Sequence, residues 1–195
     1  ADICAGAGGK TLALSALMQN AGRLVAHDLD RFRLRPIFER LTRAGVTNCE
    51  VISAQDKGKL EAAGPFDCVV IDAPCSGSGS WRRKPDAKWR LSQKQFDQRL
   101  KDQAQVLEKG YALAKPGGTI LYITCSVLPE ENTSQVAAFL SRHKDMRLVP
   151  YKEQWSRTIG SPAPESADGA EDTLVLTPAR HDTDGFFVSV MRKAA

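Results

Sequence analysis

The sequence lacks any long apolar run, any internal repeat and any regular pattern of cysteines. No stretch approaches the ~20 apolar residues that a membrane-spanning helix needs, so we expect no membrane association. Its five cysteines are odd in number and irregularly spaced, unlike the framework of a secreted disulfide-rich protein. No CxxC pair or group of histidines accompanies them, which argues against a metal site. We therefore expect a cytoplasmic protein whose thiols stay reduced.

The length of the chain suits one well-buried core and is short for two. With 195 residues, we expect a single domain over 1–195, and a monomer as the default state. The first residues, Ala1–Cys4, have the pattern of the end of a strand, with nothing before them to complete it. We therefore expect that the N-terminal part of the domain is missing from this chain.

The positive charge of the chain is concentrated in one segment. Residues 81–101 hold eight Lys/Arg against two Asp, whereas the rest of the chain has 19 basic and 21 acidic residues. Trp81 and Trp89 are interleaved with these charges, as stacking surfaces or as parts of the core. Phosphate neutralisation and base stacking favour nucleic-acid binding here, although a solvated helix face has the same composition. The candidate phosphate contacts are Arg82, Arg83 and Lys88.

Strand and helix patterns alternate along the chain, which predicts a doubly wound α/β domain. Pro36 interrupts the second helical pattern and Lys115-Pro-Gly-Gly118 ends the third. A segment at 156–172, rich in Ser, Pro, Ala, Gly and acids, is expected to be a loop. We predict strands at 1–4, 24–26, 51–52, 68–71, 119–123, 174–176 and 185–191, and helices at 11–20, 31–44, 92–114 and 130–142.

Two cysteines directly follow predicted buried strands. Cys75 follows the strand at 68–71, and Cys125 follows the strand at 119–123. The carboxyl ends of parallel strands meet at the edge where open α/β folds bind their ligands. Two thiols at that edge, one near Asp72, suggest covalent chemistry. The alternatives are a disulfide between them or two small buried apolar side chains.

The stretch from Cys4 to Thr11 predicts a backbone turn that binds a nucleotide or a carboxylate at a helix N-terminus. A phosphate-binding loop would need glycine where Cys4 stands, and a dinucleotide site would need a third glycine in register. With both of these sites disfavoured, the expected ligand is a nucleoside cofactor without a pyrophosphate. The candidate cofactor residues in this turn are Cys4, Ala5, Gly6, Ala7, Gly8, Gly9 and Lys10, with Lys10 a candidate partner for a carboxylate.

Two acidic residues extend this cofactor hypothesis. Asp28 follows the second predicted strand and can accept hydrogen bonds from a ribose diol, while Asp56 follows the third and could bond an adenine amino group. A glycine turn followed by these two acids is the order expected for S-adenosylmethionine. The alternative for Asp28 is a helix cap.

Taken together, these residues resemble the catalytic domain of the RNA 5-methylcytosine methyltransferases, the NOL1/NOP2/Sun family, and particularly its bacterial rRNA branch. The likeness spans nearly the whole chain. One departure is Gly6-Ala7, where many members have Ala-Pro. The matching stretches are Asp2-Ile-Cys-Ala-Gly-Ala-Gly-Gly-Lys-Thr11, Asp28 with Arg33-Leu34, Asp72-Ala-Pro-Cys-Ser-Gly-Ser-Gly79, Arg82-Arg-Lys-Pro-Asp-Ala-Lys-Trp89, Thr124-Cys-Ser-Val-Leu-Pro-Glu-Glu-Asn132 and Asp184-Gly-Phe-Phe187.

The resemblance implies a Rossmann-like class I methyltransferase fold, with a mostly parallel sheet and an antiparallel C-terminal strand. It implies S-adenosylmethionine as cofactor, with Arg33 and Asp72 added to its candidate contacts, and methylation of carbon 5 of cytosine in RNA, first of all rRNA. Cys125 would attack the base, Cys75 would assist release, and Asp72 would hold N3 of the ring. The alternatives are a tRNA substrate, a class I methyltransferase on another substrate, and an inactive RNA-binding relative.

Overall fold

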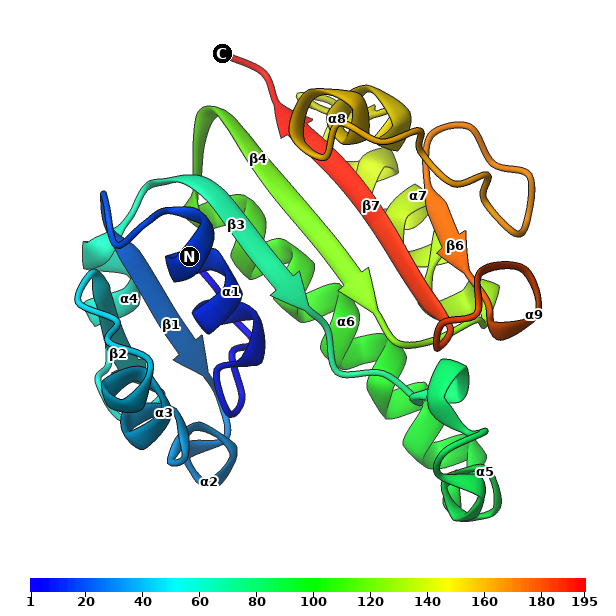
Figure 1. Cartoon of the computed structure of the whole chain (residues 1–195), viewed down its shortest axis with the longest axis horizontal. Helices are drawn as coiled ribbons and strands as arrows, with labels where there is room; N and C mark the ends of the chain where they lie inside the picture. Colours follow the sequence, from blue (N-terminus) through cyan, green and yellow to red (C-terminus); the bar gives the residue numbers. More distant parts are fainter.

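The computed structural model describes all 195 residues, which form a twisted sheet with helices on both faces (Figure 1). None of its helices is both long and apolar enough to cross a membrane. The strands are β1 (Leu24–Asp28), β2 (Cys49–Ser53), β3 (Phe66–Asp72), β4 (Ala114–Thr124), β5 (Met146–Val149), β6 (Leu174–Leu176) and β7 (Phe186–Lys193). The helices are α1 (Gly9–Leu17), α2 (Arg31–Leu34), α3 (Ile37–Arg43), α4 (Lys59–Ala63), α5 (Pro85–Arg90), α6 (Gln93–Leu113), α7 (Thr133–Arg142), α8 (Tyr151–Thr158) and α9 (Pro178–His181), with 3-10 turns η1 (Ser78–Ser80) and η2 (Pro129–Glu131).

The sheet is parallel on one side and antiparallel on the other, as expected. β1 pairs with β2 and β3 pairs with β4, both in parallel, while β7 runs antiparallel to β4, β5 and β6. Asp2 forms single parallel bridges to Ala26 of β1 and Val70 of β3, and so joins the two parallel pairs. The carboxyl ends of β1, β3 and β4 therefore lie along one edge (Figure 1).

The predicted strand at 1–4 is reduced to this bridge. The amide of Asp2 donates to Val25 and that of Ile3 donates to Val70, after which the chain turns away at Cys4 into the glycine turn. The side chain of Asp2 is fully buried and accepts a hydrogen bond from Thr11 at 2.7 Å. The start of α1 is thereby fixed against the bridge.

Other predicted bounds differ from the structure where backbone chemistry intervenes. The single helix predicted at 31–44 is two helices, α2 and α3, because Pro36 has no N–H to donate to the first of them. The stretch Lys115-Pro-Gly-Gly118 does follow the end of α6, but it already belongs to β4. α8 extends to Thr158, into the predicted loop, and the sequence patterns did not predict β5.

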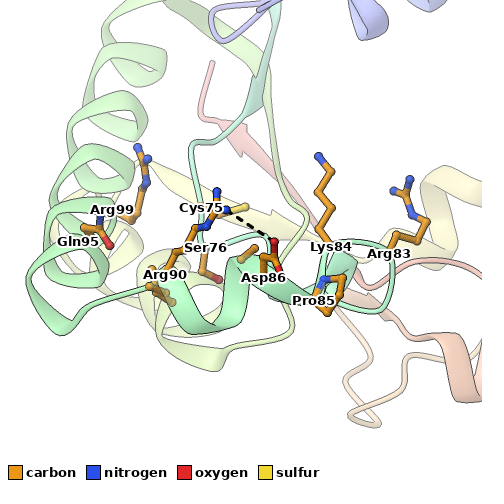
Figure 2. Close-up of a pocket in the computed structure, with 11 residues that line it drawn as sticks. Cys75, Ser76, Arg83, Lys84, Pro85, Asp86, Arg90, Gln95 and Arg99 are labelled. Atoms are coloured by element: carbon orange, nitrogen blue, oxygen red, sulfur yellow. Dashed lines mark ion pairs between the residues drawn. The ribbon is translucent and has the colours of Figure 1, made fainter.

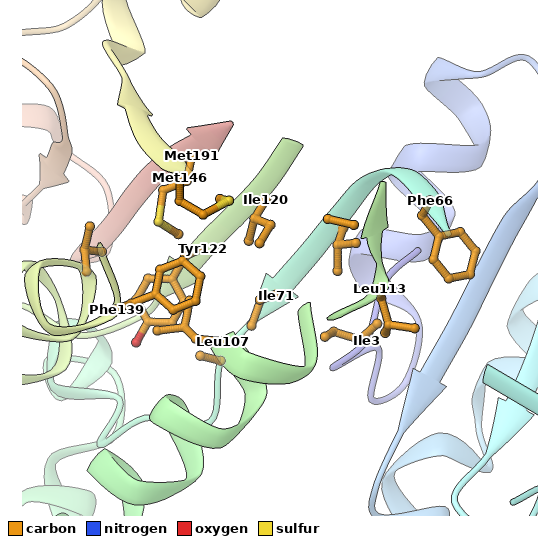
Figure 3. Packing of buried hydrophobic residues seen from close by; sticks show 14 of the residues in the cluster. Ile3, Phe66, Ile71, Leu107, Leu113, Ile120, Tyr122, Phe139, Met146 and Met191 are labelled. Carbon is orange, nitrogen blue, oxygen red and sulfur yellow. The ribbon is translucent and has the colours of Figure 1, made fainter. Parts of the chain in front are cut away.

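The main hydrophobic core lies between the sheet and helices α6 and α7 (Figure 3). Ile71 of β3 and Tyr122 of β4 pack against Leu107 of α6 and Phe139 of α7, and all four side chains are essentially inaccessible to solvent. A smaller cluster places Ile37 of α3 and its neighbours against β1 on the other face. The strand ends that carry the site residues are thus held by close packing.

Candidate active site

Cys75 and Cys125 meet at the edge of the sheet, as the strand order predicts. β3 and β4 are in register up to the pair Asp72 and Ile123, and the chain leaves both strands at the same level. The two sulfur atoms lie 3.3 Å apart. This distance is longer than the ~2.05 Å of a disulfide bond, and both thiols are free. A hydrogen bond between the thiols, and not a disulfide, is the observed arrangement.

The two thiols differ in acidity because they share a proton. The hydrogen bond between the thiols lowers the pKa of Cys125, even though burial acts in the opposite direction. The hydrogen bond to Cys125 and burial both raise the pKa of Cys75 well above its usual range. Since the thiolate is the reactive form of cysteine, this direction is consistent with the prediction that Cys125 is the nucleophile of the pair.

An ion pair lies next to the thiols. The ammonium group of Lys10, in the first turn of α1, donates to a carboxylate oxygen of Asp72 at 2.6 Å. Both side chains are about one-third exposed, at 35% each. The pair connects the glycine turn to the end of β3. The charge of Asp72 raises the pKa of Cys125, and the charge of Lys10 lowers it by a smaller amount.

Asp28 holds the glycine turn in place. Its carboxylate is 4% exposed and accepts hydrogen bonds from the amides of Gly6 and Asp30, each at 2.8 Å. Asp28 is not the cap of the next helix, because the N-cap residue of α2 is Asp30, whose side chain accepts from the amides of Phe32 and Arg33. A carboxylate can accept about four hydrogen bonds, so Asp28 can still bind a diol.

A cavity of about 490 Å³ opens beside Asp28. Three of the predicted cofactor residues line it, namely Cys4, Asp28 and Arg33. One wall comes from α6, which the sequence patterns did not connect with the site. The α6 residues that line the cavity are Arg99, Asp102, Gln105, Val106 and Lys109. Apart from the adjacent pair Gln105 and Val106, they recur every three or four residues, which marks one helix face. The size and the acceptor at its rim fit a nucleoside.

The S-adenosylmethionine hypothesis predicts that replacing Asp28 by asparagine weakens binding of this cofactor by roughly 10- to 100-fold. The amide loses the charge and one acceptor oxygen, and its NH₂ group would face a backbone N–H donor. Calorimetric titration with S-adenosylmethionine would measure the loss, with Asp97→Asn on the exposed face of α6 as the control. Equal affinities for the two variants would contradict the assignment of Asp28.

Asp56 lies after β2, as predicted, but its carboxylate is directed to its own turn. It accepts from the amide and hydroxyl of Ser53 at 3.0 and 2.8 Å and from the ammonium of Lys59 at 2.9 Å. The hydrogen bond from Lys59, followed by those from Ser53, lowers the pKa of Asp56 to about 2. Asp56 does not line the cavity beside Asp28. Its role at an adenine stays a prediction.

A second cavity, of about 580 Å³, extends from Cys75 over the basic segment (Figure 2). Arg83, Lys84, Arg90 and Arg99 line it, so that four cations surround the approach to one thiol. Arg99 lines both cavities and lies between them.

The predicted phosphate contacts of the basic segment interact with different partners in the structure. Arg82 and Arg83 both form ion pairs with Asp184, whereas Lys88 lies over the ring of Trp89. Trp89 is 81% exposed and thus available for stacking.

The loops that carry the cysteines are bonded to each other. The hydroxyl of Ser78 contacts that of Ser126 at 2.9 Å, and the amide of Gly79 donates to the carbonyl of Cys125 at 2.9 Å. The group that approaches Gly79 most closely is the backbone of Gly185. Gly79 therefore allows close contact between its loop and the backbone of Gly185.

Glu131 is a site residue to which the sequence analysis gave no role. Its side chain is fully buried, and it accepts hydrogen bonds from Ser76 and Gln103 directly below the Cys75 loop. It belongs to the matching stretch that begins at Thr124, which was the only signal in the sequence.

No group of three or more His, Cys, Asp or Glu side chains is arranged to hold a metal ion.

Comparison with known proteins gives the family of this chain. Residues 1–192 match the family model of the 16S rRNA methyltransferase RsmB/F. The chain belongs to this family. Ribosomal RNA small subunit methyltransferase B of Enterobacter sp. strain 638, a curated RsmB/F relative, is 36% identical over 98% of this chain and 41% of its own length. The Shewanella oneidensis protein of the same name is 35% identical over 99% of this chain and 42% of its own. The chain thus spans about two-fifths of these relatives.

Solved structures agree with the RsmB/F assignment. NSun6 from Pyrococcus horikoshii, determined with SFG, matches with a TM-score of 0.81 and 27% identity, over 100% of this chain and 47% of that one. A methyltransferase homolog protein from the same organism matches with a TM-score of 0.75 and 34% identity, over 98% and 60%. The predicted methyltransferase fold is therefore confirmed.

Proposed function

We propose that this chain transfers a methyl group from S-adenosylmethionine to carbon 5 of a cytosine in rRNA, through a covalent bond between Cys125 and the base. The observation that carries the proposal is the thiol pair beside Lys10 and Asp72, between a cavity that fits a nucleoside and a cavity lined by cations. The names of the RsmB/F relatives support rRNA as the substrate class.

The attack begins at Cys125. Carbon 5 is a poor nucleophile in the intact ring, so a bond must first form between the Cys125 sulfur and carbon 6. The electron pair of the C5–C6 double bond then shifts toward N3, where a proton held by Asp72 and Lys10 offsets the charge. The ring becomes an enamine whose carbon 5 can accept a methyl group, and N3 returns its proton as that bond forms.

The cofactor, when bound, supplies an electrophilic sulfonium methyl group. We infer that Asp28 holds the ribose of the cofactor, and that the glycine turn and Lys10 face its carboxylate. Arg33 closes the turn from outside, since its guanidinium would lie 3.4 Å from any side-chain carbon at Gly6. The structure of NSun6 from Pyrococcus horikoshii, which was determined with SFG, supports ligand binding by a protein of this fold.

Release requires that carbon 5 lose its proton and that the bond to Cys125 break. Cys75, 3.3 Å from Cys125, can pass its own proton to the departing sulfur and take the carbon 5 proton in its place. The C5–H and C6–S bonds break, the C5–C6 double bond re-forms, and both thiols end protonated. Cys75 thus acts in the second half of the reaction.

A 16S rRNA transcript that contains 5-fluorocytidine tests the proposal. Fluorine on carbon 5 cannot leave as a proton, so the reaction stalls with the base attached to the enzyme. Incubation with S-adenosylmethionine, digestion and mass spectrometry should find the base on the peptide of Cys125. Attachment to Cys75 would reverse the proposed roles, as in DNA cytosine methyltransferases. Cofactor binding without any attachment would indicate another methyl acceptor, and failure to bind the cofactor an inactive RNA-binding relative.

A further inference from the structure

Glu131 is a buried carboxylate without a cationic partner. Its side chain is 0% exposed, and no lysine, arginine or histidine forms an ion pair with it. It accepts hydrogen bonds from the amide of Ser76 at 2.7 Å, the hydroxyl of Ser76 at 2.5 Å and the side-chain amide of Gln103 at 3.0 Å. Because burial of an unpaired carboxylate is costly, its position beneath a reactive loop calls for a function.

These hydrogen bonds hold the backbone on both sides of Cys75. Glu131 binds Ser76, which follows the cysteine, and Gln103 donates both to Glu131 and to the carbonyl of Pro74, which precedes it, at 2.9 Å. Glu131 itself is anchored from the strand that leads to Cys125, since the hydroxyl of Tyr122 donates to its carbonyl at 2.8 Å. Glu131 therefore connects the Cys75 loop, through its side chain, with the strand that leads to Cys125, through its carbonyl.

The charge of Glu131 also acts on Cys75. The shared hydrogen bond, burial and the charge of Cys125 raise the pKa of Cys75, and the charge of Glu131 adds to them. The other charged groups around the pair are Asp72 and Lys10, which act on Cys125, and the cavity wall of Arg83, Lys84, Asp86, Arg90 and Arg99. Glu131 is the only one of these groups that is fully buried and bonded to the Cys75 loop.

We propose that Glu131 is a positioning residue for this reaction: its carboxylate holds Cys75 beside Cys125 with the proton on Cys75. Cys125 then attacks the base, and Cys75 assists release of the product. This inference rests on the proposed function for what the thiols do. The arrangement of the proton, however, can be tested without RNA.

Glu131→Gln tests this role, because glutamine keeps the size of the side chain and loses its charge. Glu130→Gln is the matched control, an exposed neighbour with the same chemistry. In the RNA-free protein, we expect iodoacetamide to modify Cys125 at least tenfold faster than Cys75 at pH 7, as in the control. In Glu131→Gln, this ratio should fall at least threefold. With rRNA and cofactor, the variant should retain the covalent RNA adduct several times longer than the control does.

Ser76→Ala provides a second measurement if Glu131→Gln does not fold. It removes one hydrogen bond to Glu131 and keeps the charge, so we expect a longer-lived adduct with a smaller change in the alkylation ratio. An alkylation ratio and an adduct lifetime equal to those of Glu130→Gln would overturn the inference. So would a loss of attack and release in equal measure, which a purely structural role predicts. If the wild-type protein forms no adduct, the proposed function fails while the alkylation result still stands.

Discussion

Cys125→Ala is expected to reduce methyl transfer to rRNA by about 10³-fold or more, because removal of a covalent nucleophile leaves only binding and electrostatic contributions. The substitution removes one sulfur of the pair that lies 3.3 Å apart and leaves the surrounding hydrogen bonds in place. Transfer of labelled methyl groups from S-adenosylmethionine to a 16S rRNA transcript would measure the loss. Cofactor affinity should stay unchanged, since Cys125 does not line the cavity beside Asp28.

Cys75→Ala should give the opposite pattern of intermediates. Attack by Cys125 needs no proton transfer to Cys75, so a first methyl group should still be transferred, but more slowly, because Cys125 loses the hydrogen bond that lowers its pKa. The RNA should then stay bonded to the protein. A band of RNA-linked protein on a denaturing gel would report this. Cys68→Ala is a suitable control, because Cys68 is an exposed thiol on β3 outside both cavities. An RNA-linked band in Cys125→Ala, and none in Cys75→Ala, would show that the roles are reversed.

The meeting of Cys75 and Cys125 at one sheet edge could be predicted, because it depends on local sequence patterns. Two apolar runs, each followed within four residues by a cysteine, place both thiols at one sheet edge. The positions of the glycine turn and Asp28 could be predicted for the same reason, since each lies where a strand ends. A parallel sheet turns such sequence positions into spatial neighbours.

The parts that the sequence did not predict depend on packing between distant segments. Glu131 has the sequence pattern of an exposed helix start, and only the tertiary structure buries it under the Cys75 loop. The α6 wall of the cavity beside Asp28 has the composition of a charged surface helix, and most of the residues that it faces, at positions 3–33, lie more than 60 residues away in the chain. Asp56 shows the reverse case, in which a carboxylate predicted to face a ligand bonds to its own turn instead.

Gly79→Ala is expected to destabilise the protein by about 2–4 kcal/mol, through overpacking and the loss of backbone hydrogen bonds. A side-chain carbon at this position would lie 2.1 Å from the carbonyl oxygen of Gly185, and backbone cannot move aside as a flexible side chain can. The amide of Gly79 donates to the carbonyl of Cys125, and its carbonyl accepts from the amide of Gly185. Relief of the clash must therefore separate the loop from both partners.

Thermal unfolding should show this as a midpoint roughly 5–15 °C below that of the wild type. Gly9→Ala is the matched control, because nothing lies within 4 Å of the added carbon and alanine favours its helix. The clash should also separate the sulfurs, since Gly79 is the backbone contact between their loops. Mild oxidation with diamide should therefore form a Cys75–Cys125 disulfide more slowly in folded Gly79→Ala than in Gly9→Ala. A wild-type midpoint together with an unchanged rate would contradict the close approach of Gly79 to Gly185, and with it the expected effect of this contact on the distance between the two thiols.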